Sequence, residues 1–217
     1  MTGRLSVAVP TGRLLGDAVA LLSRLGLAAD GVGDDRRLLI DLPGDVRVLK
    51  AKPTDLLTYV ERGAADVGIS GRDMLLEQGR DVYELLDLGF GACRAVVAFP
   101  EERADELWQP GHALRIATKY PRLTARFFEQ EARSVEVIVL YGSVELAPLV
   151  DLADGIVDLV MSGRTLRENG LRQVAVIAES TARLVVNRAS LTRSGRVTEF
   201  VARVETHLTG PDRRVHV

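Results

Sequence analysis

Positions 152–166 concentrate the residue types best suited to chemistry in this chain. The segment runs Leu-Ala-Asp-Gly-Ile-Val-Asp-Leu-Val-Met-Ser-Gly-Arg-Thr-Leu, so Asp154 and Asp158 flank an expected buried strand. The small and hydroxyl residues at the expected start of the following helix are Ser162, Gly163 and Thr165. Backbone N–H groups, hydroxyls and the helix dipole at such a turn favour an anion such as phosphate. Carboxylates accept hydrogen bonds from sugar hydroxyls, so the segment predicts a pocket for a phosphorylated sugar.

A simpler interpretation of the same segment stays open. Ser162 could cap the helix, and the two aspartates could lie on solvated strand ends. Spacing alone does not decide between these interpretations.

Three further loops follow expected strands and carry glycine or cations. They are Pro10-Thr11-Gly12-Arg13, Gly71-Arg72-Asp73 and Thr118-Lys119-Tyr120-Pro121-Arg122. Each loop by itself is typical of an ordinary turn or helix start. Because ligands bind beyond the carboxyl ends of strands in α/β sheets, the shared position predicts one cleft for an anionic ligand.

The sequence lacks the patterns of nucleophilic and zinc catalysis. It contains no Gly-x-Ser-x-Gly and no Ser-x-x-Lys, and Cys93 has no obvious histidine partner. His112, His207 and His216 have no zinc-type spacing, so we interpret them as surface histidines. Cys93 is interpreted as a small buried hydrophobe.

Composition limits the class of protein further. The chain has 217 residues, of which 47% are hydrophobic and 27% charged, and this composition indicates a globular protein. A formal charge of -2 argues against a general nucleic-acid binder. The single cysteine excludes an internal disulfide, and no segment resembles a signal peptide or a membrane span. We therefore expect a cytoplasmic protein with no membrane partner.

The elements that must position these loops alternate between strand and helix. Expected strands cover 5–9, 38–41, 46–49, 66–70, 95–99, 114–118, 135–140, 155–160, 174–178 and 184–187. Helical periodicity covers 14–25 and 54–62, starts again near Leu123, and ends with a helix around 197–208. This alternation predicts an α/β fold with mostly parallel sheets, and two close glycines at 87–93 predict a crossing or hinge.

A series of motifs from Leu5 to about Leu191 resembles one known family. The motifs are Pro-x-Gly-Arg-Leu, Asp-x-x-x-Tyr-Val-Glu-x-Gly-Ala-Ala-Asp-Val-Gly-Ile, Gly-x-Asp-x-Leu-Leu-Glu, Leu-Leu-Asp-Leu-Gly-Phe-Gly-x-Cys-Arg, Ala-Thr-Lys-Tyr-Pro, Gly-Ser-Val-Glu-Leu-Ala-Pro and Ser-Gly-Arg-Thr-Leu. In this order they resemble the ATP phosphoribosyltransferase family. The series is far more specific than any one motif.

The resemblance implies a fold and an activity. It implies a two-lobed fold of the periplasmic-binding-protein type with a cleft between the lobes, in which residues 1–88 plus about 181–217 form the first α/β domain and 89–180 form the second. The implied reaction joins ATP and phosphoribosyl pyrophosphate into phosphoribosyl-ATP and pyrophosphate with Mg²⁺ present. That reaction is the first step of histidine biosynthesis.

The resemblance also assigns residues by their match to the family's motifs. Implied ligands of phosphoribosyl pyrophosphate are Glu145, Asp154, Asp158, Ser162, Gly163, Arg164, Thr165 and Leu166. Implied ligands of ATP are Gly12, Arg13, Gly71, Asp73 and Lys119. Arg13 and Arg36, with Arg37 as the alternative to Arg36, are implied to act catalytically on the departing pyrophosphate.

Two positions depart from the family pattern. Thr11 stands where the family usually has lysine, and Ser162 stands where it usually has threonine, which keeps the hydroxyl. Lys50 and Lys52 are candidates to replace the charge that Thr11 lacks.

The length resembles the short form of the family, which lacks a histidine-sensing domain. That form implies a separate regulatory subunit similar to histidyl-tRNA synthetase, and a homodimer within a hetero-oligomer. A competing hypothesis is a solute-binding or effector-sensing module, because the same two-lobed fold serves both purposes.

Overall fold

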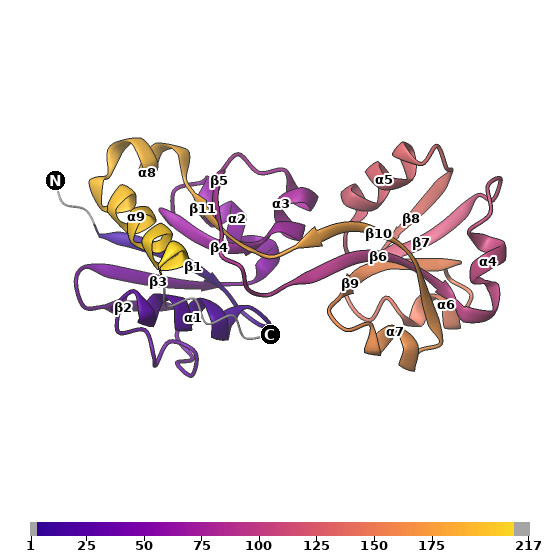
Figure 1. Cartoon of the computed structure of the whole chain (residues 1–217), viewed down its shortest axis with the longest axis horizontal. Coiled ribbons are helices and arrows are strands. Elements are labelled where there is room, and N and C mark those ends of the chain that lie inside the picture. The colour runs from indigo at the N-terminus through magenta and orange to yellow at the C-terminus, as the bar shows by residue number, and fades with distance from the viewer. Residues whose placement is uncertain (1–3, 211–217) are drawn as a thin grey trace. The chain divides into compact units, whose positions relative to one another are not determined.

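The computed structural model describes residues 4–210, which form two compact units (Figure 1). Of the described residues, unit 1 contains 4–75, 79–91 and 181–210, and unit 2 contains 76–78 and 92–180. Apart from the three residues at the end of α3, the chain therefore leaves unit 1 once, after residue 91, and returns to it once, at residue 181. The boundary at 91/92 lies three residues after the predicted 88/89 boundary. The assignment of these units as domains stays a prediction.

Unit 1 is built on a six-stranded sheet with the order β2-β3-β1-β4-β11-β5. Its elements are β1 (Leu5–Pro10), α1 (Leu15–Arg24), β2 (Leu39–Leu42), β3 (Val46–Ala51), α2 (Pro53–Glu61), β4 (Val67–Gly71), α3 (Arg72–Gln78), β5 (Tyr83–Asp87), β11 (Ala182–Val186), α8 (Arg188–Arg193) and α9 (Gly195–Thr209). Strands β3, β1 and β4 are parallel, and the other pairings are antiparallel.

Unit 2 is built on a five-stranded sheet with the order β10-β6-β9-β7-β8. Its elements are β6 (Cys93–Pro100), a 3-10 turn (Glu101–Arg103), α4 (Ala104–Leu107), β7 (Leu114–Thr118), α5 (Pro121–Gln130), β8 (Val135–Val139), α6 (Leu146–Leu149), β9 (Gly155–Val160), α7 (Arg164–Glu168) and β10 (Leu171–Ser180). Strands β9, β7 and β8 are parallel, whereas β6 and β10 are antiparallel to their neighbours.

Helices cover both faces of the sheet in unit 1. Val67 and Ile69 of β4 join the cluster that also holds buried side chains of α1 and α9. Gly68 between them faces the opposite way, because a Cβ there would lie 2.7 Å from Val60 Cγ2 and 2.9 Å from Leu56 Cδ2 of α2. Alternate residues of β4 thus face the helices on opposite sides of the sheet, and the glycine at position 68 allows α2 to approach closely.

The same alternation divides the core of unit 2. Ile156 and Val160 of β9 pack in the cluster that contains Ala147 of α6 and Leu166 of α7. Val157, on the other face, packs with residues of α4 and α5. Residue 158 therefore belongs to the face that α6 and α7 cover.

The predicted α/β class is confirmed, but the sheets are mixed rather than mostly parallel. Each unit keeps three adjacent parallel strands. The antiparallel pairings involve the β2–β3 hairpin and the four strands next to the two connections between the units, which are β5, β6, β10 and β11. Strand periodicity in the sequence does not reveal the direction of these pairings. Strand β5 and the short helices α3, α4, α6 and α8 were also not predicted.

Gly155 gives a direct test of this packing. A Cβ at this position would lie 2.3 Å from Phe99 Cδ1 and 2.7 Å from the Ala98 carbonyl oxygen, and Phe99 is fully buried. We expect Gly155→Ala to lower the free energy of unfolding by about 1–3 kcal/mol through overpacking, as measured by urea denaturation. Gly142→Ala, where the added Cβ meets open space, is the matched control. Equal stability of the two variants would contradict this packing argument.

Candidate functional site

In unit 2 the predicted residues gather at the carboxyl edge of three parallel strands. Thr118, at the end of β7, is in register with Val157 of β9 and with Val139, which ends β8. The segments that follow these strands therefore emerge at one edge of the sheet. They carry Lys119, Glu145 and the turn 161–165.

Asp158 and Lys119 form the charged centre of this edge. The Lys119 Nζ lies 3.9 Å from the Asp158 Oδ2, and only 14% of the Asp158 side chain is exposed. Burial raises the pKa of the Asp158 carboxyl above its ordinary value, and the charge of Glu145 adds to this rise. Lys119 and the backbone of Leu159 offset part of it. The carboxylate is thus held in a poorly solvated position where a hydrogen-bonding ligand would stabilise it.

Thr118 fixes the turn that carries Lys119. Its buried hydroxyl donates to the Val157 carbonyl at 2.8 Å and accepts from the Tyr120 backbone N–H at 2.9 Å. The sequence predicts a functional loop at 118–122 but does not predict this role of Thr118. A threonine hydroxyl two residues before a backbone N–H is the available signal, and it is typical of many ordinary turns.

The turn 161–165 lies open at the same edge. Gly163 has φ +71°, which favours glycine, and its neighbours Ser162, Arg164 and Thr165 are exposed. Leu166 is buried in the core and anchors the turn. Helix α7 has only five residues, so its dipole contributes little, and the donors for an anion are the backbone N–H groups and hydroxyls of the turn itself.

Asp154 lies at the opposite end of β9 from this turn. It accepts from the Arg115 backbone N–H at 2.8 Å and forms an ion pair with the Arg115 guanidinium at 2.9 Å. Burial by itself raises the pKa of Asp154, but the hydrogen bonds from Arg115 outweigh it and lower the pKa overall. Asp158 is also inside β9 instead of at its end. The two aspartates therefore do not flank the strand as predicted, and the structure does not bring Asp154 to the edge.

In unit 1 a second group of predicted residues lies at the carboxyl edge of β3, β1 and β4. Gly12, with φ +82°, and Arg13 form the loop after β1, where the Thr11 backbone N–H donates to the Ala51 carbonyl at 2.8 Å. The Arg13 Nη1 donates to the Gly91 carbonyl at 2.7 Å. This contact fixes the direction of an exposed guanidinium.

Gly71 ends β4 of the same sheet, and Asp73 lies in the first turn of α3. Asp73 is buried, and its Oδ1 lies 2.2 Å from the place that a Cβ of residue 71 would take. Glycine at 71 thus leaves room for the carboxylate to fold back over the end of the strand.

The structure also distinguishes the two arginines before β2. The Arg37 guanidinium donates to both carboxylate oxygens of Asp35, with an Nη2–Oδ2 distance of 2.6 Å. Arg36 is exposed and has no such carboxylate partner among the contacts found within residues 4–210. Arg36 is therefore the better placed of the two to meet a ligand.

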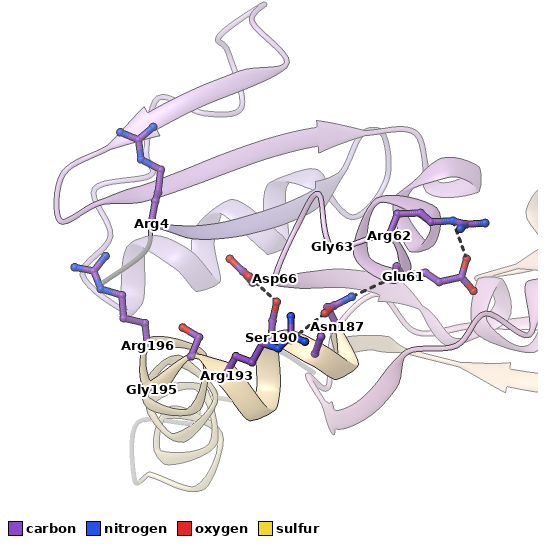
Figure 2. A pocket seen from close by; sticks show the side chains of 12 residues that line it. Arg4, Glu61, Arg62, Gly63, Asp66, Asn187, Ser190, Arg193, Gly195 and Arg196 are labelled. Carbon is purple, nitrogen blue, oxygen red and sulfur yellow. Dashed lines mark hydrogen bonds and ion pairs between the residues drawn. The ribbon is translucent and has the colours of Figure 1, made fainter. Parts of the chain in front are cut away.

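A pocket of unit 1 with a volume of about 640 Å³ is a different feature (Figure 2). It lies beside the residues that precede β1 and β4, and it holds none of the predicted site residues. Arg4 and Arg196 in its lining form ion pairs with Asp41 and Asp45. Asp66 accepts from the Ser190 hydroxyl and the Ser6 backbone N–H. These contacts join elements of unit 1 to one another.

The remaining sequence-based expectations concern cysteine, histidine and metal. Cys93 is buried in β6, His112 is exposed, and His207 lies half-buried on α9, whereas His216 falls outside the described residues. Across residues 4–210, no three carboxylate, imidazole or thiol side chains gather as a metal-binding group. None of the helices in that range has the length and apolarity that crossing a membrane requires.

Comparisons with known proteins agree with this geometry. The family model described as ATP phosphoribosyltransferase matches residues 52–206. An ATP phosphoribosyltransferase of Geobacter metallireducens is 48% identical over 212 residues, which cover 96% of this chain and 100% of the relative. A solved ATP phosphoribosyl transferase (HisG:HisZ) complex from Thermotoga maritima is similar with a TM-score of 0.80 and 33% identity, covering 94% of this chain and 98% of that chain.

The fold is also similar to a periplasmic aliphatic sulphonate binding protein of Escherichia coli. The TM-score is 0.59 at 12% identity, and the match covers 96% of this chain and 69% of that chain. This likeness supports the predicted periplasmic-binding-protein type of fold and nothing about function.

The opposite environments of Asp158 and Asp154 predict opposite pH effects. A raised pKa means that ionising Asp158 costs stability, so Asp158→Asn should increase the free energy of unfolding at neutral pH. A lowered pKa means that ionised Asp154 stabilises the fold, so Asp154→Asn should decrease the free energy of unfolding at neutral pH. The Asp158 difference should shrink as the pH falls through its raised pKa toward about 3.9, the ordinary aspartate pKa, whereas the Asp154 difference should shrink as the pH falls below about 3.9.

Urea denaturation at several pH values measures both effects in one series. The two variants serve as controls for each other, because each removes one carboxylate from the same segment. A loss of stability in both variants at neutral pH would contradict the electrostatic argument for Asp158.

Proposed function

The chain belongs to the ATP phosphoribosyltransferase family, and on that premise we propose how its residues carry out the reaction. Enzymes of this family transfer the phosphoribosyl group of phosphoribosyl pyrophosphate to N1 of ATP, in the first step of histidine biosynthesis. This chain is a pentosyltransferase of that kind. One observation supports the site most strongly: Asp158, Lys119 and the open turn 161–165 meet at one carboxyl edge of unit 2.

This edge of unit 2 holds the phosphoribosyl group. The 5-phosphate is bound by the backbone N–H groups and hydroxyls of Ser162, Gly163, Arg164 and Thr165, which form the exposed turn. Asp158 accepts hydrogen bonds from the ribose hydroxyls, and its poor solvation makes those bonds strong. Glu145 lies near enough to influence Asp158 and completes the rim. Leu166 holds the turn in place because its side chain is buried in the core. Asp154 is not part of the proposed pocket.

The edge of unit 1 supplies cations for the polyphosphates. Arg13, with its guanidinium directed by the Gly91 carbonyl, and Arg36 act on the departing pyrophosphate. Gly12, Gly71, Asp73 and Lys119 are proposed to contact ATP. Because the adenine N1 attacks the anomeric carbon directly, the C1–oxygen bond to pyrophosphate breaks as the N1–C1 bond forms, and no enzyme nucleophile is needed. Catalysis is then positioning and electrostatic stabilisation.

The family uses a divalent metal, and we propose that Mg²⁺ arrives with the polyphosphate of the substrates. Mg²⁺ prefers hard oxygen ligands, which the phosphates offer. The carboxylates of Asp158 and Glu145 at this edge would supply further oxygen ligands. When bound, the metal neutralises negative charge on the leaving pyrophosphate.

We also propose a regulatory partner and a cellular location. The similar Thermotoga maritima protein was solved as a HisG:HisZ complex, so we propose that this chain works with a separate regulatory subunit similar to histidyl-tRNA synthetase, as a homodimer within a hetero-oligomer. Because both substrates are intracellular metabolites, we place the enzyme in the cytoplasm.

The activity itself is tested with purified chain, ATP, phosphoribosyl pyrophosphate and Mg²⁺. Formation of phosphoribosyl-ATP is followed by ultraviolet absorbance, with pyrophosphatase present to remove the second product. We expect turnover by the chain alone or by the chain co-expressed with its regulatory subunit. A co-expressed pair that binds amino acids and forms no product would favour the solute-binding hypothesis instead.

Asp158→Asn tests the proposed ribose contact. Loss of a charged acceptor should raise the KM for phosphoribosyl pyrophosphate about tenfold or more, with a smaller effect on the KM for ATP. Asp151→Asn, on the exposed loop before β9, is the matched control and should leave both constants unchanged. A normal KM for phosphoribosyl pyrophosphate in Asp158→Asn would remove Asp158 from the pocket.

Arg13→Ala tests the charge that develops on the leaving group. The variant should lower kcat more than it raises KM, because the target of Arg13 gains charge only in the transition state. Arg24→Ala, an exposed arginine at the end of α1, is the control. An unchanged kcat in steady-state kinetics would exclude Arg13 from this role.

A further inference from the structure

Lys50 of β3 is a buried lysine whose ammonium group contacts backbone carbonyls. Only 8% of the residue is exposed. Its Nζ donates to the Val32 carbonyl at 3.2 Å and to the Asp35 carbonyl. An ammonium group has three donors and no acceptor, so burying it is tolerated when carbonyl oxygens take up those donors. Lys50 is therefore engaged inside unit 1, which makes it a poor replacement for the charge missing at Thr11.

The two carbonyls belong to the segment 31–38, which connects the region after α1 to β2. The segment is held at several other points: the Val32 side chain is buried, the Asp35 backbone N–H donates to the Gly31 carbonyl, and the Lys50 backbone N–H donates to the Leu38 carbonyl at 2.8 Å. Lys50 thus binds the segment through both its backbone and its side chain. The segment 31–38 itself contains no helix or strand that would hold its shape.

These contacts fix the residues on both sides of Arg36. On one side, Lys50 binds the carbonyl of Asp35. On the other side, Arg37 is tied back to the Asp35 carboxylate by its backbone N–H at 2.8 Å and by its guanidinium. Hydrogen bonds from Arg37 lower the pKa of Asp35 to about 2, so the carboxylate stays ionised and the tie persists at neutral pH. Arg36, between these two fixed residues, is left exposed.

We propose that Lys50 is a positioning residue for Arg36: its buried ammonium group holds the segment 31–38 in the shape that presents the Arg36 guanidinium to a polyphosphate. This inference rests on the proposed function of Arg36 at the departing pyrophosphate. Ordering an irregular segment costs backbone conformational entropy at every residue that is fixed. If Lys50 already orders the segment in the free protein, no further ordering is needed when the transition state forms. Electrostatic preorganisation requires this prior ordering.

The first experiment measures the segment directly and does not depend on turnover. Lys50→Met keeps an unbranched side chain that is one atom shorter and removes its donors. We expect amide hydrogen exchange in residues 31–38 to become about tenfold faster or more, and tryptic cleavage after Arg36 and Arg37 of the folded protein to accelerate to a similar extent. Arg47→Met, which removes a surface ion pair with Asp41 from the same strand, is the matched control.

The second experiment connects the segment to catalysis through a double-mutant cycle. In the active enzyme, Lys50→Met and Arg36→Ala should each lower kcat/KM, with the larger effect on kcat. The double variant should be no slower than Arg36→Ala alone, because Lys50 acts only through Arg36. Lys50→Gln, which keeps one N–H donor group, should fall between wild type and Lys50→Met and provides a second variant if the methionine variant folds poorly.

The outcomes separate this inference from the proposed function. Unchanged exchange and cleavage in Lys50→Met, or additive losses in the double variant, would overturn the positioning role. Normal turnover by Arg36→Ala would overturn it as well. If the wild-type enzyme with its regulatory subunit forms no phosphoribosyl-ATP, the proposed function fails, and the exchange experiment still decides whether Lys50 orders the segment.

Discussion

Parallel strand pairing is the constraint on which the rest of this structure depends. In unit 2 the register of β9, β7 and β8 brings residues 119, 140 and 158 to one edge, although they are far apart in the sequence. In unit 1, the pairing of β3, β1 and β4 does the same for the loops after each strand. A shift of one residue in either register would turn every side chain of the shifted strand to the other face. The hydrophobic patterns that set these registers therefore also determine which side chains reach the candidate site.

One strand shows how environment divides labour between identical residues. Asp154 and Asp158 are four positions apart, but the first is fully engaged by Arg115, and the second lies poorly solvated 3.9 Å from Lys119. The first contact stabilises the carboxylate and holds β9 to β7, whereas the second leaves a carboxylate that gains from a ligand. Residue type is thus a poor guide to role, because the partner decides whether a charge serves the fold or the substrate.

Much of this could be predicted from sequence because it depends on local patterns. Buried strands such as 155–160 and 114–118, the helix near 54–62, and the Ser-Gly-Arg-Thr turn all follow from hydrophobic period and turn chemistry. The partners of Asp154, the use of Arg37 by Asp35, and the burial of Lys50 could not be predicted in that way. Each depends on which distant backbone lies alongside, and single-sequence periodicity carries no information about that. The antiparallel partners of β4 and β6 were missed for the same reason.

The interrupted path of the chain has a consequence for biosynthesis. Strand β4 pairs with β11, so Gly71 lies opposite Ala182, and the intervening residues include all of unit 2. During synthesis on the ribosome, β4 therefore exposes an unpaired edge until more than half of the chain has followed it. Such edges are sites of aggregation, and contacts between residues so distant in sequence slow folding. Unit 2, whose sheet is built from one continuous stretch, is synthesised before β11 can complete the sheet of unit 1, so the edge of β4 at residues 67–71 stays unpaired throughout the synthesis of unit 2.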